Sequence, residues 1–168
     1  KGIGAPLLGA PVYSLLRSLP PTRDLPPMSK GNRYFIRLFT TSLPFALLGV
    51  IMFRLAIQFG AEERKALLMV ASYGLGSIAL IHSAQFSGHQ ITACALFTSF
   101  SLLSMSARST PVQRFPHEVI SSLLAGFLAG FAVITEFPAV LITAILALYA
   151  ISSGIRVSSK FAFISGGL

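Results

Sequence analysis

Few polar side chains in this sequence could do chemistry, and most of them lie in one short stretch. Within residues 82–90 lie five polar side chains of interest: His82, Gln85, Ser87, His89 and Gln90. A second polar turn carries Glu136, which is followed by Phe137 and Pro138. A histidine and a carboxylate at one face of a protein could bind a phosphate or a sugar, relay protons or hold a metal.

These residues also have a plainer interpretation. His82 and His89 could be interfacial residues whose hydrogen bonds are satisfied. Glu136 could cap the helix that follows it, because a carboxylate suits the positive end of a helix. A metal site needs three or four convergent ligands, so we predict no metal site and no cofactor; a divalent metal or a bound lipid stays open as the alternative.

Long apolar runs must position these side chains, and they indicate a membrane protein. The 168 residues are 54% hydrophobic and 11% charged, and the mean hydropathy is +0.76. Soluble domains carry about 25% charged residues. No Asp, Glu, Lys or Arg occurs at 66–107, 119–135 or 137–155. Because a bilayer core needs about 20 helical residues and helices satisfy their own backbone groups, the runs predict membrane-spanning helices.

The expected fold class is therefore all-α, a polytopic transmembrane helix bundle with about five full spans and the start of a sixth. Spans are predicted at 38–59, 66–85, 91–107, 118–135 and 137–153, and the sixth begins at Phe161. Residues 1–37 should form an N-terminal interfacial segment and a proline-rich basic loop at 17–37, and residues 38–168 the bundle. We also expect this chain to be a piece of a longer protein, because it starts at Lys1 without Met.

The positive charge fits a membrane surface better than nucleic acid. The net charge is +8, and the 13 Lys and Arg lie mainly between or beside the apolar runs. No basic stripe with interleaved aromatics is present, so we expect no nucleic acid partner. Basic residues in the loops 60–65, 108–117 and 154–160 place these loops in the cytoplasm. The turns 86–90 and 136–138 then face the outer side, and alternation puts 17–37 there too.

Gly126 and Gly130 form a GxxxG pattern in the predicted fourth span. Such small residues let two helix backbones approach closely. We predict that they pack inside one bundle; the alternative is specific dimerisation of two chains.

The motifs occur in an order that resembles a known superfamily. The opening KGIGAPLLGAPVYSLLR is similar to a Lys-Pro-Pro-Gly-type stretch that leads into a Pro-Tyr segment, and Arg37-Leu38 with Ser42-Leu43 resembles an Arg-Leu-x-Ser-Ala-Leu helix start. The Phe-Ser-Gly-His turn at 86–89 and the Thr-Glu-Phe-Pro turn at 135–138 resemble two turns of the same family. The order resembles the GT-C polytopic membrane glycosyltransferases, near the dolichyl-phosphate-mannose protein mannosyltransferase-like and aminoarabinose transferase-like proteins.

The resemblance implies transfer of a sugar from a polyprenyl-phosphate donor at the outer face of a bacterial inner (cytoplasmic) membrane. It places the catalytic acids on a loop before Lys1, so the catalytic residues of this chain are unknown. Lys1 matches the family's lysine, which could pair with lipid phosphate, and His89 stands where members often carry an acid. The candidate ligand-binding residues are Lys1, His82, Gln85, His89 and Glu136. Of these, Lys1, His89 and Glu136 should converge near a lipid-facing groove on the outer side.

An alternative function stays open beside the transferase. The chain could be a non-catalytic structural subunit that keeps a GT-C-like fold and packs within a larger membrane complex. Its partners would then be other membrane subunits and membrane lipid, rather than a polyprenyl-phosphate sugar.

Overall fold

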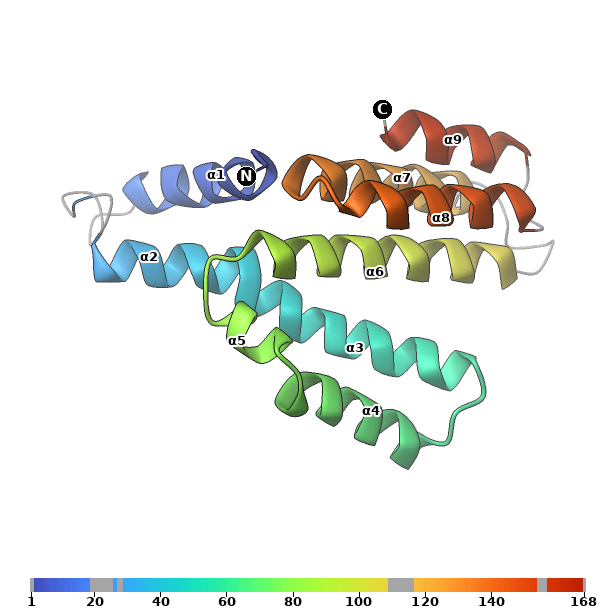
Figure 1. Cartoon of the computed structure of the whole chain (residues 1–168), viewed down its shortest axis with the longest axis horizontal. Coiled ribbons are helices and arrows are strands. Elements are labelled where there is room, and N and C mark those ends of the chain that lie inside the picture. The colour runs from blue at the N-terminus through green and yellow to red at the C-terminus, as the bar shows by residue number, and fades with distance from the viewer. Residues whose placement is uncertain (1, 19–25, 27–28, 109–116, 154–156, 168) are drawn as a thin grey trace. The chain divides into compact units, whose positions relative to one another are not determined.

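The computed structural model describes residues 2–18, 26, 29–108, 117–153 and 157–167, and every element in this part of the chain is helical (Figure 1). Contacts divide the chain into two compact units, Gly2–Ile91 and Thr92–Leu168. The all-α prediction is confirmed. Three helices are long and apolar enough to cross a membrane: Lys30–Gln58, Gly88–Ala107 and Glu118–Thr135. Such helices indicate association with a membrane.

The unit Gly2–Ile91 begins with two helices that the sequence only partly predicts. Helix α1 (Gly4–Ser18) carries Pro11 in its interior and packs against α2 (Lys30–Arg37). The basic loop was predicted to extend through residue 37, and this is wrong for 30–37. Ser29 starts the helix, because its Oγ accepts the backbone N–H of Asn32 at 3.2 Å and so satisfies one of the free amides of the first turn.

A π-helical turn, η1 (Leu38–Ser42), joins α2 to α3 (Leu43–Gln58) without a break. The proline at position 44 explains the wider turn, since it has no N–H and its ring would meet the carbonyl of Thr40 in a regular α-helix. The Leu43 N–H instead bonds the Leu38 carbonyl, five residues back. The predicted first span, 38–59, is therefore the C-terminal part of a helix that starts at Lys30.

Helix α3 ends in a glycine turn and returns as α4 (Glu63–Gly76), so that α3 and α4 pack as a helical hairpin (Figure 1). Gly60 has a φ of 87°, a conformation that is strained for residues with a Cβ. The Gly60 N–H bonds the Ile57 carbonyl at 2.9 Å, and the Ala61 N–H bonds the Ala56 carbonyl at 3.0 Å. These two bonds form the Schellman motif, which satisfies carbonyls at the helix end.

The predicted second span, 66–85, is broken. Helix α4 ends at Gly76, Ser77 is extended, and a five-residue helix α5 (Ala79–Ser83) follows. The Ser77 Oγ donates to the Tyr73 carbonyl at 2.6 Å and accepts the Ala79 N–H at 3.2 Å. One hydroxyl thus ends one helix and starts the next, where Gly74 and Gly76 already weaken helix formation.

The unit Thr92–Leu168 contains most of α6 (Gly88–Arg108), followed by α7 (His117–Thr135), α8 (Ala139–Ser152) and α9 (Val157–Gly167). The predicted spans 91–107 and 118–135 fall on α6 and α7. Helix α8, however, has 14 residues, which at 1.5 Å each give about 21 Å. Helix α9 has 11 residues. Among the described helices only three reach spanning length, so the prediction of about five full spans is wrong.

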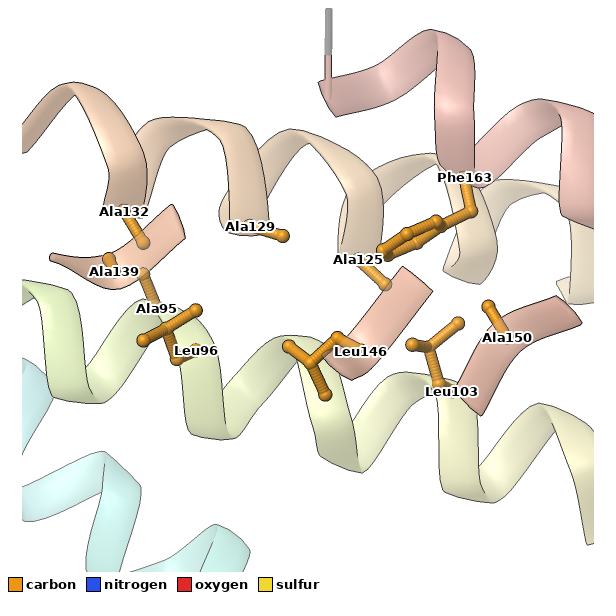
Figure 2. Close-up of a cluster of buried hydrophobic side chains, with 10 residues drawn as sticks. All are labelled: Ala95, Leu96, Leu103, Ala125, Ala129, Ala132, Ala139, Leu146, Ala150 and Phe163. Carbon is orange, nitrogen blue, oxygen red and sulfur yellow. The ribbon is translucent and has the colours of Figure 1, made fainter. Parts of the chain in front are cut away.

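Small residues dominate the core of this unit, which allows the helices to approach closely. Figure 2 shows the buried cluster, to which α6, α7 and α8 contribute mainly alanine and leucine, and α9 contributes Phe163. The Ser99 Oγ on α6 donates to the Ala125 carbonyl on α7 at 2.7 Å. This buried hydrogen bond fixes α6 and α7 in register.

Gly126 and Gly130 are used inside the chain, as predicted. A Cβ built on Gly126 would overlap the Phe163 carbonyl oxygen and lie 2.8 Å from the Phe163 carbonyl carbon. A Cβ on Gly130 would lie 2.5 Å from the Gly167 oxygen. The two glycines therefore form the surface of α7 on which α9 packs.

Candidate functional site

The structure brings together part of the polar stretch 82–90. His82 lies on α5 and His89 on the first turn of α6, with their ring centroids 5.8 Å apart in an edge-to-face arrangement. The Ser87 Oγ lies 3.3 Å from His82 Nδ1. Gln90 has a structural role, because it is 2% exposed and its Nε2 donates to the Tyr73 hydroxyl at 3.1 Å. This contact ties α6 to α4.

For two of the other predicted site residues, Lys1 and Glu136, a place beside the histidines stays untested. Lys1 lies outside the described residues. Glu136 belongs to the unit Thr92–Leu168, where the Ala139 N–H bonds its carbonyl at the turn between α7 and α8. A shared site of Glu136 with His82 and His89 therefore stays a prediction. Among the described residues, no three His, Cys, Asp or Glu side chains come together in a way that could hold a metal ion.

Gln85 instead lines a groove that the sequence did not predict. Its other walls are Phe86 and four residues of α2 (Lys30, Arg33, Tyr34 and Arg37), and its volume is about 670 Å³. We call it the basic groove. The four α2 residues stand at positions i, i+3, i+4 and i+7, which share one face of an α-helix. That spacing was visible in the sequence, but the neighbouring prolines led to the prediction of a loop.

The charges of the basic groove are of one sign. Three of its six lining residues are cationic and none is acidic. The ion pair resolved in the described part of the chain, Lys65 with Glu62 at 3.6 Å, lies beyond the far end of α3. Lys30 and Arg33 also occupy the start of a helix, where cations oppose the helix dipole. A bound anion would relieve both the mutual repulsion and the unfavourable dipole interaction.

Arg37 is held in place by the end of α5. Its Nη1 donates to the Ala84 carbonyl at 2.9 Å, and its buried Nε has no hydrogen-bond partner among the described residues. Arg37 also lines a second cavity, of about 240 Å³, with Tyr34, Leu38, Ser42 and Ala84. The Arg37 side chain thus borders both cavities.

Aromatic and apolar residues border the cations. Tyr34 and Phe86 are about half exposed. Behind Phe86, α1 approaches so closely that a Cβ on Gly9 would lie 3.3 Å from the Phe86 ring. Tyrosine beside Lys and Arg is typical of the level where a membrane meets water. The basic groove therefore combines the chemistry of a phosphate site with an apolar border.

No protein family, curated protein or solved structure matches this chain in the comparisons. The resemblance to the GT-C superfamily accordingly stays a prediction.

Proposed function

We propose that this chain is an integral membrane protein of the bacterial inner membrane that holds a lipid-linked phosphate in the basic groove. The ligand class is the polyprenyl-phosphate sugar that the GT-C-like resemblance implies. The observation that carries the proposal is the set of three cations, Lys30, Arg33 and Arg37, on one helical face with no acidic residue lining the groove. Arginine and lysine are the side chains that bind phosphate most strongly.

The position of the groove on its helix supports a lipid ligand. The helix Lys30–Gln58 has 29 residues, which correspond to about 44 Å at 1.5 Å per residue. A bilayer core is about 30 Å thick, so one end of this helix extends beyond the core. The cations lie in the first eight residues and the apolar part follows. This order supports a position of the groove at the level of lipid headgroups.

In the proposed function, residues of this chain bind and orient the ligand. Lys30 and Arg33 attract the phosphate, Arg37 offers hydrogen bonds from a planar guanidinium, and Tyr34 and Phe86 contact the apolar chain next to the phosphate. Transfer chemistry needs carboxylates as well, and no carboxylate lines the basic groove. The contribution proposed for the groove is therefore donor binding.

Binding of a polyprenyl phosphate tests the proposal. The protein is placed in nanodiscs of neutral phosphatidylcholine and titrated with polyprenyl phosphate and, separately, with the uncharged polyprenol. We expect selective binding of the phosphate. Binding should be about a hundredfold or more weaker in Lys30→Gln/Arg33→Gln, since each lost charge-assisted hydrogen bond costs about 1.5 kcal/mol, which is about tenfold in affinity.

The matched control is Arg64→Gln/Lys65→Gln, which removes the same two charges from the exposed start of α4. This variant should bind polyprenyl phosphate like the wild type. Equal binding of polyprenol and polyprenyl phosphate would refute the proposal. Equal weakening by the two double substitutions would also refute it, because the effect would then come from net charge rather than from the groove.

The structural-subunit alternative has one observation in its favour. Helix α8 is about 21 Å long and exposes large apolar residues along its length, among them Leu141, Ile145 and Leu148. Helix α8 is too short to span a bilayer, and its exposed apolar surface is suited to packing against other membrane helices. This alternative predicts no selectivity for the phosphate in the nanodisc titration.

A further inference from the structure

Beside the basic groove, two hydroxyl groups of the π turn bind the backbone end of α5. The Ser42 Oγ donates to the Ser83 carbonyl at 2.8 Å. The Thr41 Oγ1 lies 2.8 Å from the Arg37 carbonyl and 3.2 Å from the Ser83 carbonyl, so its single proton is shared between them. The next carbonyl along the chain, that of Ala84, accepts the bond from Arg37.

The π turn makes this arrangement available. In a helix with i→i+5 bonds, residues four and five positions after Arg37 both lie near the side that Arg37 faces. In a regular α-helix, the residues three and four positions on would share that face, and the residue five positions on would point away from it. The wider turn therefore directs Arg37, Thr41 and Ser42 together toward residues 83 and 84. Thr40, in contrast, bonds only the Ile36 carbonyl of its own helix, at 2.6 Å.

We infer that Ser42, assisted by Thr41, is a positioning residue of the basic groove and acts on the ligand through Arg37. The hydroxyls of Thr41 and Ser42 hold the Ser83 carbonyl in place. This fixes the backbone at residues 83 and 84, so that the Ala84 carbonyl can hold the Arg37 guanidinium at the groove. Arg37 then meets a phosphate with the guanidinium donors that its bond to the Ala84 carbonyl does not use. This inference rests on the proposed function and adds residues that do not line the basic groove.

A double-mutant cycle with Arg37 tests this role. The probe is polyprenyl phosphate in phosphatidylcholine nanodiscs, and the readout is its dissociation constant. Ser42→Ala should weaken binding about threefold to tenfold in the wild-type background, the range expected for the loss of one neutral hydrogen bond. The same substitution in an Arg37→Gln background should have almost no effect, because the group it positions is already gone.

Two further variants separate positioning from folding. Thr40→Val, a buried neighbour that does not bond α5, should leave the affinity unchanged. Ser42→Thr keeps the hydroxyl and should restore binding close to the wild-type affinity. If Ser42→Ala does not fold, Ser42→Cys replaces it, since the thiol has similar size but is a weak donor.

The outcomes distinguish the inference from the proposed function. If the wild type does not prefer polyprenyl phosphate over polyprenol, the proposed function fails and the inference fails with it. If binding is selective but Ser42→Ala weakens it equally with and without Arg37, the groove is a phosphate site and only the positioning role is overturned. If Ser42→Ala weakens binding in the wild-type background but not in the Arg37→Gln background, the result supports both the phosphate site and the positioning role of Ser42.

Discussion

The close approach of α9 to α7 gives the sharpest prediction about folding. Replacing Gly126 by alanine adds one methyl group that would overlap the Phe163 carbonyl oxygen and lie 2.8 Å from the carbonyl carbon. Carbon atoms in good contact are about 3.5–4.0 Å apart. The neighbouring atoms are backbone, so α9 must move away from α7 by about 1 Å.

The expected cost follows from that movement. A gap of about 0.5–1 Å already removes a quarter to a half of the dispersion energy of each contact, and overpacking typically costs about 1–3 kcal/mol. We expect Gly126→Ala to lower the free energy of unfolding by about 2 kcal/mol. Gly166→Ala should act on the same interface, because its Cβ would overlap the Leu123 carbonyl. The two costs together should be less than additive, since the first displacement makes room for the second.

Unfolding in detergent, followed by circular dichroism at increasing denaturant, measures the effect. Gly74→Ala is the matched control, because nothing lies within 4 Å of a Cβ at this α4 position. Gly74→Ala should raise the free energy of unfolding slightly or leave it unchanged, since alanine is a better helix former than glycine. If Gly126→Ala proves as harmless as Gly74→Ala, α9 does not pack on α7 in this way.

Two further predictions concern buried groups of α6. Ser99→Ala should destabilise the protein by about 1 kcal/mol, since it removes the buried bond to the Ala125 carbonyl of α7. Ser101→Ala should leave the free energy of unfolding nearly unchanged in the same denaturant titration, because its hydroxyl bonds the Phe97 carbonyl of its own helix. A larger loss of stability in Ser101→Ala than in Ser99→Ala would contradict the register of α6 against α7. Cys94 is buried and should react slowly with a maleimide in the native protein and rapidly in denaturant; fast labelling of the native protein would show that α6 is open at this point.

Much of the helical architecture could be predicted from charge placement alone. The span 118–135 coincides with the observed helix Glu118–Thr135, and 91–107 lies inside Gly88–Ala107. Both are charge-free or nearly so and are bounded by polar residues. Because lipid leaves no partner for backbone groups, such runs have to be helical whatever the tertiary contacts are.

The basic groove was not predicted from the sequence, and the reason is physical. The prolines at 20–27 favour a loop over 17–37, whereas residues 30–37 form a helix. The start of α2 depends on the hydrogen bond that Ser29 Oγ accepts from the Asn32 N–H, and the groove depends on the contact of Arg37 with the Ala84 carbonyl. Neither can be seen from composition, although the i, i+3, i+7 spacing of Lys30, Arg33 and Arg37 was present in the sequence.

The sequence by itself determined the helical class, the association with a membrane and the use of Gly126 and Gly130 for close packing, because these follow from apolar runs and side-chain size. The structure was needed to locate the helix break within the charge-free run 66–107. The break is at Ser77, whose hydroxyl both ends α4 and starts α5. The structure also decided the π turn before Pro44 and the gathering of Arg37, Thr41 and Ser42 on α5. The break at Ser77 and the π turn rest on interactions within a few residues. The contacts of Arg37, Thr41 and Ser42 join residues more than forty positions apart, which no local pattern records.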